Sequence, residues 1–216
     1  MAVELWLVRH GQAAFATGDY DRLTDLGWQQ ARWLGQHLAH MGTPFDRICA
    51  GTLRRQQETA TAITDSIGGT VETIPGFEEY DAHGLMTRAG AADQDPDLPR
   101  RAHFRRLRGL LLDWSQGQAE GSETWEAYNA RARSAVAEAT KAGKGRVLVA
   151  SSGGTIALIL MQATGLPVAQ MIEFNLQCRN SSVTRLVFAS ERTYVNMFNA
   201  IPHLEHPDRL HAETYS

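Results

Sequence analysis

Short runs of apolar residues recur along the chain at the length of buried β-strands. They are rich in Val, Ile and Leu, and turn-forming or polar residues bound most of them. The pattern predicts six strands: Leu5–Val8, Arg47–Ala50, Val71–Ile74, Val147–Ala150, Val183–Phe188 and Thr193–Phe198.

Between these runs, apolar residues recur every three or four positions, which indicates helices with one buried face. The first predicted helix runs from about Asp25 to Met41, with Thr24 before it as an N-cap. Further helices are predicted over Leu53–Ile67, Arg100–Trp114, Glu123–Lys141 and Gly154–Ala163. Strands that alternate with helices favour a mostly parallel sheet covered on both faces, so we expect a three-layer α/β/α fold in a single domain, residues 1–216.

The alternation of strands and helices stops in the middle of the chain. Residues 76–99 are rich in turn-forming and acidic residues, and two predicted helices follow before the next strand. An excursion of this length within a compact α/β domain is commonly a functional lid. We therefore expect residues 76–142 to form a cap or insertion region.

Composition and charge exclude several classes of protein. The chain has 216 residues, 21 basic and 24 acidic, with a formal net charge of -3. This balance gives no broad surface for a polyanion, so we do not expect a nucleic-acid partner. Cys49 and Cys178 are too few for a disulfide scaffold and lack metal-site spacing. With no basic leader before the first strand, a cytoplasmic location is expected.

One uncharged stretch, residues 147–172, is long enough to cross a bilayer. A polar turn at residues 151–154 interrupts it, and Gly165 and Pro167 follow. These residues divide the stretch into a strand, a glycine turn and a helix, and a buried βα unit explains it better than a membrane span.

Residues with catalytic chemistry follow four of the predicted strands. Carboxyl ends of parallel strands meet at one edge of the sheet, where ligands bind in open α/β folds. We therefore expect these segments to converge: Arg9-His10-Gly11-Gln12, Gly51-Thr52-Leu53-Arg54-Arg55, Phe77-Glu78-Glu79-Tyr80-Asp81 and Ser151-Ser152-Gly153-Gly154.

This set of groups suits phosphoryl transfer to a side chain. A neutral imidazole can attack phosphorus and hold the phosphoryl group covalently. Guanidinium groups bind its oxygens in pairs, and a carboxylic acid can protonate the departing oxygen. Backbone N–H groups at the start of a helix bind the same anion. None of these steps requires a metal ion or a cofactor, and we expect neither; the expected partner is a small phosphorylated substrate.

The same residues resemble the histidine phosphatase superfamily, in its phosphoglycerate-mutase-like branch. Matching motifs follow one another in the family order over nearly the whole chain. They are Leu7-Val8-Arg9-His10-Gly11-Gln12, Leu23-Thr24-x-x-Gly27-x-x-Gln30-Ala31, Leu53-x-Arg55-x-x-x-Thr59-Ala60, Phe77-x-Glu79, Val147–Thr155 and Asn199-x-x-x-His203-Leu204. The resemblance implies a mostly parallel sheet flanked by helices, in agreement with the pattern above.

The resemblance also implies a role for each matching residue. His10 is the phosphate acceptor, Arg9 and Arg55 form the phosphate clamp, and Glu79 is the proton donor. The expected substrate-binding residues are Gly11, Gln12, Ser152, Gly153 and His203. For two of these roles the preceding residue is an alternative: Arg54 for Arg55, and Glu78 for Glu79. Asp81 is a further candidate acid, and a structural role for each residue is the competing interpretation.

One position departs from the family, which usually has a second histidine where this chain has Ser152. Serine donates a neutral hydrogen bond, worth about 0.5–1.5 kcal/mol, against about 1.5–3 kcal/mol for a charged one. The difference predicts a reaction roughly 5- to 30-fold slower. His83 and His203 are candidates to supply the missing imidazole, although either can equally be structural. Ser152, with Tyr20-Asp21-Arg22-Leu23, fits a serine-containing subset of the superfamily.

The sequence thus predicts a metal-independent phosphatase that hydrolyses a phosphomonoester through a phosphohistidine on His10. Two alternatives stay open. One is a module that binds phosphate or a phosphorylated protein with weak or no turnover, which the loss of the second histidine would explain. The other is a phosphomutase.

Overall fold

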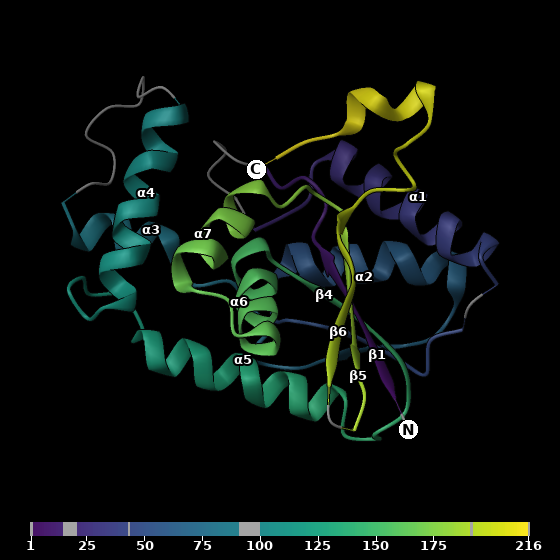
Figure 1. Cartoon of the computed structure of the whole chain (residues 1–216). Helices are drawn as coiled ribbons and strands as arrows, with labels where there is room; N and C mark the ends of the chain where they lie inside the picture. Colours follow the sequence, from purple (N-terminus) through teal and green to yellow (C-terminus); the bar gives the residue numbers. More distant parts are fainter. Residues whose placement is uncertain (1, 15–20, 43, 91–99, 191, 216) are drawn as a thin grey trace.

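A six-stranded mixed sheet forms the centre of the protein in the computed structural model (Figure 1). The structure describes residues 2–14, 21–42, 44–90, 100–190 and 192–215. The strands are β1 (Val3–Arg9), β2 (Arg47–Ala50), β3 (Val71–Thr73), β4 (Gly145–Ser151), β5 (Val183–Phe188) and β6 (Thr193–Ala200). Their order across the sheet is β3-β2-β4-β1-β5-β6.

Four of the strands, β3, β2, β4 and β1, run parallel to one another. β5 pairs antiparallel with β1, and β6 antiparallel with β5. The parallel strands therefore end at one edge, where β1 and β4 finish together with Arg9 opposite Ser151. This is the mostly parallel sheet that the alternating pattern predicts.

Alternate residues of β1 face the two helical layers, because successive side chains of a strand point to opposite faces. Leu5 and Leu7 pack with Tyr128 and other residues of α5 (Trp125–Ala139) and α6 (Gly153–Thr164). Trp6 and Val8 pack on the other face with α1 (Asp25–His40) and α2 (Arg54–Ile67). The predicted three-layer α/β/α arrangement is confirmed.

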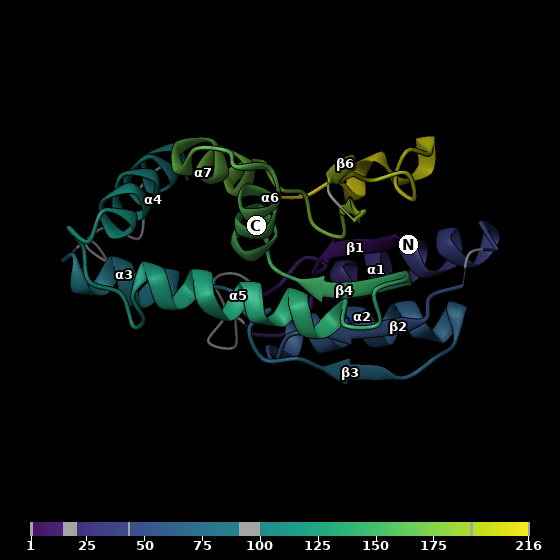
Figure 2. The same cartoon turned by 60° about the horizontal axis from the view of Figure 1, so that its bottom comes forward.

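The other helices lie mostly to one side of the sheet (Figures 1 and 2). They are α3 (Ala82–Arg88), α4 (Arg100–Ser115) and α7 (Val168–Gln177); a short 3₁₀ helix over Pro207–Ala212 lies apart from them, against α1 (Figure 1). α3 and α4, together with α5, belong to the region 76–142 that was expected to form a cap.

Two of these α-helices, and the 3₁₀ helix, are absent from the pattern-based prediction. α3 lies in the segment predicted as turn-rich, where the side chain of Asp81 caps it by accepting from the amide of Gly84 at 2.8 Å. α7 begins directly after Pro167 and takes the end of the uncharged run, so that run forms a strand and two helices rather than one. Tyr20 and residues 91–99 of the predicted loop lie outside the described residues. No helix in the described ranges is both long and apolar enough to cross a bilayer.

Candidate active site

The loop after β1 brings Arg9 and His10 to the edge of the sheet where the parallel strands end. The amide of Arg9 donates to the carbonyl of Ser182 at 3.0 Å, and the amide of His10 donates to the carbonyl of Ser151 at 2.9 Å. These bonds join the loop to the neighbouring chain segments on both sides. Both side chains are buried, with 8% of Arg9 and 2% of His10 exposed.

The next residues of this loop pack closely against the start of α1. A Cβ atom on Gly11 would lie only 2.8 Å from the carbonyl carbon of Gly27, which explains why glycine occupies both positions. Gln12 is held by two bonds of 2.8 Å: its amide N–H donates to Oε1 of Gln30, and its Oε1 accepts from Oγ1 of Thr24. The loop is thereby fixed in place beside His10.

The hydrogen bonds of His10 define which ring nitrogen carries the proton. Nδ1 lies 2.8 Å from the carbonyl oxygen of Gly11, which can only accept, so Nδ1 carries the hydrogen. Nε2 then accepts from Nε of Arg55 at 3.2 Å. Burial, followed by the charges of Arg55 and Arg9, lowers the pKa of His10 well below 6.5. The imidazole is therefore neutral near pH 7, with a lone pair on Nε2.

Two guanidinium groups accompany this imidazole. Arg9 donates through Nη1 to the carbonyl of Cys178, at the end of α7. Arg55 stands in the first turn of α2, is 6% exposed, and forms an ion pair at 2.9 Å with Asp21. Its neighbour Arg54 is exposed and pairs instead with Glu58 on the same helix. It is thus Arg55, rather than Arg54, that contacts His10.

Asp21 is a site residue whose role the sequence motif did not reveal. Its carboxylate accepts from the backbone amide of Arg54 at 2.9 Å and from Nη1 of Arg55 at the same distance. It therefore caps the start of α2 and orients the guanidinium that touches His10.

Glu79, in the segment before α3, contacts the glycine turn at the start of α6. Its Oε2 accepts from the amide of Gly154 at 2.8 Å, and its Oε1 from the amide of Tyr80 at 3.2 Å. Burial raises the pKa of Glu79 above 4.5, although the Gly154 amide and the charges of Arg55 and Arg9 oppose that shift. A carboxyl group in this environment keeps its proton to higher pH than an exposed one.

The other two candidate acids have structural partners. The carboxylate of Glu78 accepts from Oγ1 of Thr52 at 2.7 Å and from the amide of Gly76. Asp81 is exposed and caps α3. Of the three carboxylates in this segment, Glu79 is the one bound to the glycine turn.

Arg131 on α5 holds the segment that carries Glu79. Its guanidinium donates to the main-chain carbonyls of Gly76 at 3.1 Å, Glu78 at 2.9 Å and Glu79 at 3.4 Å. Its ion pair with Glu123, at 2.6 Å, fixes the guanidinium from the other side. No sequence motif identifies Arg131, because helical spacing cannot show which loop a side chain reaches.

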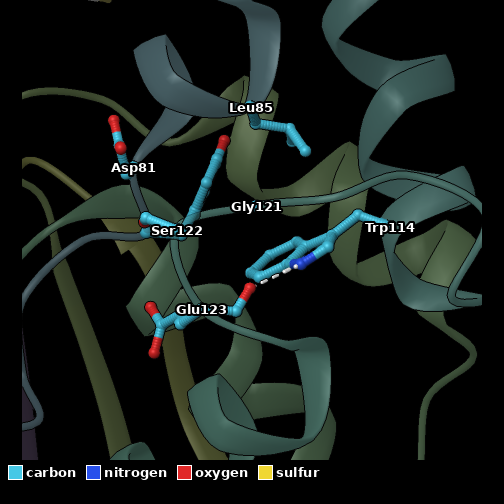
Figure 3. A pocket seen from close by; sticks show the side chains of 7 residues that line it. Asp81, Leu85, Trp114, Gly121, Ser122 and Glu123 are labelled. Atoms are coloured by element: carbon cyan, nitrogen blue, oxygen red, sulfur yellow. Dashed lines mark hydrogen bonds between the residues drawn. The ribbon is translucent and has the colours of Figure 1, made fainter. Parts of the chain in front are cut away.

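A narrow crevice adjoins this segment (Figure 3). Nε1 of Trp114 donates to the carbonyl of Glu123 at 3.0 Å, and the ring of Trp114 stacks on that of Tyr128 with centroids 5.5 Å apart. Tyr128 in turn reaches Oε1 of Glu79 with its hydroxyl at 3.4 Å. The crevice thus belongs to the packing behind Glu79; its lining residues are Tyr80, Asp81, Leu85, Trp114, Gly121, Ser122 and Glu123.

Ser152 occupies the position where the resemblance leads one to expect histidine. It precedes α6 as its N-cap residue but makes no capping hydrogen bond with its side chain. Its hydroxyl oxygen accepts instead from Nε2 of Gln56 at 2.8 Å, and both side chains are fully buried. A Cβ atom on the next residue, Gly153, would lie 3.4 Å from Nε of Arg9, so the glycine turn passes close to the guanidinium.

The two histidines considered as replacements lie elsewhere. His203 is buried and its Nε2 lies 2.8 Å from Oγ of Ser181, whose amide donates to the carbonyl of His10. It therefore supports the His10 loop from behind. His83 is exposed on α3. Within the parts of the chain that the structure describes, no recorded contact joins either imidazole to Ser152.

Burial, with smaller effects from His37 and Arg209, lowers the pKa of His203 to about 3. His203 is therefore neutral near pH 7 and brings no positive charge to a phosphate. In the described residues, no group of three or more His, Cys, Asp or Glu side chains is arranged to hold a metal ion.

Comparison with known proteins places this arrangement in context. The family model for the histidine phosphatase superfamily (branch 1) matches residues 5–201. The chain is 28% identical over 217 residues to a probable phosphoglycerate mutase, GpmB, of Enterobacter sp. (strain 638), covering 95% of this chain and 96% of that protein.

Solved structures also match over most of the chain. A mycobacterial glucosyl-3-phosphoglycerate phosphatase in complex with inorganic phosphate superposes with a TM-score of 0.68 and 24% identity, covering 94% of this chain and 99% of that one. A mutant phosphoserine phosphatase from Entamoeba histolytica in complex with phosphoserine gives a TM-score of 0.66 and 21% identity, with the same coverage. These matches confirm the predicted phosphoglycerate-mutase-like fold.

Proposed function

Since the chain belongs to branch 1 of the histidine phosphatase superfamily, we propose that it is a phosphatase that hydrolyses a small phosphomonoester through a phosphohistidine on His10. Proteins similar to it are named as phosphatases and as phosphomutases, so membership supports phosphoryl transfer in general. The choice of hydrolysis rests on the residues themselves.

The observation that carries the proposal is the pair of hydrogen bonds made by the His10 ring. Its Nδ1 hydrogen is bound by the Gly11 carbonyl, and its Nε2 lone pair faces the guanidinium of Arg55. An incoming phosphoryl group bound by Arg55 and Arg9 would meet this lone pair. The pairing of a neutral nucleophile with two permanent positive charges suits attack on a phosphate dianion.

In the first step, Nε2 of His10 forms a bond to phosphorus and the bond from phosphorus to the ester oxygen breaks. The electron pair of that bond goes to the departing oxygen, which takes the proton of Glu79 and leaves as an alcohol. The bond at Nδ1 to the Gly11 carbonyl stabilises the positive charge that the ring acquires. The guanidinium groups of Arg9 and Arg55 bind the phosphoryl oxygens throughout.

In the second step, the Glu79 carboxylate removes a proton from a water molecule as the water oxygen attacks phosphorus. The N–P bond breaks, its electron pair returns to Nε2 of His10, and inorganic phosphate leaves. Glu79 is then protonated again, so it acts first as acid and then as base. Its raised pKa supports this double role.

We propose that residues 76–142 act as the cap over this site within a single domain. Glu79 and Arg131 both belong to this region, so the proposed proton donor and the side chain that holds its loop share one segment. A mutase must also retain and reorient its phosphorylated product, and we assign no residues to that task. We also propose a cytoplasmic location, which the two free thiols, Cys49 and Cys178, support.

A steady-state turnover assay over a panel of phosphomonoesters tests the proposal. The wild-type protein should release inorganic phosphate, His10→Ala should not, and the exposed His40→Ala should match the wild type. Tight phosphate binding without turnover would instead identify a binding module, and transfer of the phosphoryl group within the substrate would identify a mutase.

A further inference from the structure

The first turn of α2 sends two consecutive side chains to the candidate site. Arg55 reaches His10, and the next residue, Gln56, reaches Ser152. Gln56 is completely buried, so its carboxamide is surrounded by protein. No motif of the sequence analysis included this residue.

The main chain fixes which way the Gln56 amide points. Its Nε2 donates to the carbonyl of Phe77 at 3.0 Å as well as to Oγ of Ser152 at 2.8 Å. A carbonyl can only accept, so a rotated amide would place oxygen against oxygen at Phe77. Oε1 therefore points away, toward Gly51, where a Cβ atom would overlap it. Among the described residues, this buried Oε1 has no hydrogen-bond partner.

The orientation of Gln56 determines what the Ser152 hydroxyl can do. Since Oγ of Ser152 accepts from Gln56, its own hydrogen must point to another acceptor. It does not cap α6, and within the described residues no acceptor for that hydrogen is recorded. The two residues that flank Ser152 both lie close to the site. The carbonyl of Ser151 accepts from the amide of His10, and Gly153 lies close to the guanidinium of Arg9. The hydroxyl thus lies among the groups assigned to the phosphoryl group.

We propose that Gln56 is a positioning residue, which turns the hydroxyl of Ser152 so that its hydrogen donates to a non-bridging oxygen of the transferring phosphoryl group. Ser152 binds the phosphate directly, and Gln56 acts through it. The hydrogen bond is neutral and no proton is transferred. The pair provides one donor and no charge at the position of the histidine that the family usually has. This inference rests on the proposed function.

A double-mutant cycle with Ser152→Ala and Gln56→Leu tests the pair. Each single variant should lower kcat on p-nitrophenyl phosphate roughly 2- to 12-fold, the value of one neutral hydrogen bond. The double variant should lose no more than the larger single loss, because both changes remove the same donor. Inhibition by vanadate should weaken by the same factor as kcat, and Ser152→Thr, which keeps the hydroxyl, should recover most of the loss.

The matched control is Gln162→Leu on α6, which also removes a glutamine whose amide donates to a main-chain carbonyl, that of Asn129 at 3.0 Å. It should keep the wild-type kcat and vanadate affinity. Losses that add in the double variant, or a Ser152→Ala variant with unchanged kcat and vanadate affinity, would overturn the inference. If Gln56→Leu does not fold, Gln56→Met replaces it, and the Ser152→Ala and Ser152→Thr pair still decides.

Failure of this inference is distinguishable from failure of the proposed function. A wild-type protein without turnover would refute the phosphatase. Vanadate binding does not require turnover, so the Ser152 and Gln56 variants would still be expected to weaken it.

Discussion

Replacing Gly154 with alanine should misplace Glu79 while leaving the rest of the protein intact. A Cβ atom at this position would overlap Oε1 of Glu79 and Cε1 of Tyr80, and would lie 2.9 Å from Cδ1 of Tyr80. Carbon atoms in contact are about 3.5–4.0 Å apart, so the acid loop must move by about 1 Å. The backbone bond from Gly154 to the carboxylate, 2.8 Å long, would be distorted by the same movement.

A displacement of about 1 Å can cost about 100-fold in rate when a reacting group depends on its position. We therefore expect Gly154→Ala to lower kcat/KM, which reports the steps through phosphorylation of His10, by about 100-fold for an ester whose leaving group needs a proton. The loss in kcat/KM should be much smaller for p-nitrophenyl phosphate, because its leaving group departs without protonation. Stopped assays with an alkyl phosphate and with p-nitrophenyl phosphate measure both rates.

The control for this substitution is Gly109→Ala on α4, where a new Cβ atom meets no other heavy atom within 4 Å. Alanine favours a helix over glycine by about 1 kcal/mol, so this variant should be slightly more stable and equally active. Equal losses of kcat/KM on both substrates, or an unchanged kcat/KM for the alkyl phosphate in Gly154→Ala, would refute the assignment of Glu79 as the proton donor.

Three further predictions follow from the charges of the site. The value of kcat/KM reports the ionisable groups of the free enzyme. It should fall at low pH as His10, whose pKa lies well below 6.5, becomes protonated. It should also fall at high pH as Glu79, whose pKa is raised above 4.5, loses its proton. Glu79→Gln should remove the high-pH limb, and a limb that persists would contradict the assignment. Arg55→Lys should lower kcat/KM roughly 10- to 150-fold, since lysine cannot reproduce the paired contacts of a guanidinium. Arg54→Lys should change kcat/KM by no more than about 2-fold. Equal effects of the two substitutions would contradict the assignment of Arg55 to the site. In the native state the pKa of His203 is about 3 against 6.5 when unfolded, so the unfolded state binds the additional proton and stability falls as pH drops below 6.5. Urea unfolding at pH 7 and at pH 5 measures this effect. Between these pH values the free energy of unfolding of His203→Gln should fall by about 2 kcal/mol less than that of the wild type. Equal decreases in the two proteins would contradict a buried neutral imidazole.

Much of the fold could be predicted because its signals are local. The predicted strands and helices lie within a few residues of the observed ones, and the strands predicted over Arg47–Ala50 and Val183–Phe188 have the observed bounds. α3 and α7 were not predicted: α3 has only seven residues, and α7 begins inside the uncharged run and continues beyond it, so no change in composition marks its start.

The candidate site, like the fold, could be predicted only in part. Motifs predicted roles for His10, Arg55 and Glu79; in the structure Arg55 contacts His10, and Glu79 binds the glycine turn at Gly154. The residues that orient them were not identifiable, because their partners are distant in sequence. Gln56 and Ser152 are separated by 96 positions, and only the folded chain shows that they touch.

Ser152 shows which structural information a departure from the family motif does not contain. The sequence shows that the usual histidine is absent, and charge alone predicts a slower reaction. The structure adds that the amide of Gln56 reaches this position and fixes how the serine is oriented. Compared with the usual histidine, Ser152 therefore lacks a positive charge, but its hydroxyl is oriented by Gln56. The residue at position 152 alone does not reveal this contact.

The central claim is that the phosphoryl group is held covalently on His10. Mixing the protein with ³²P-labelled substrate and quenching within milliseconds in alkaline denaturant tests it most directly. The account predicts a labelled protein whose label survives base and is lost in acid, with no label on His10→Ala. An active wild-type protein that never carries the label, or a His10→Ala variant labelled to the same extent, would contradict it.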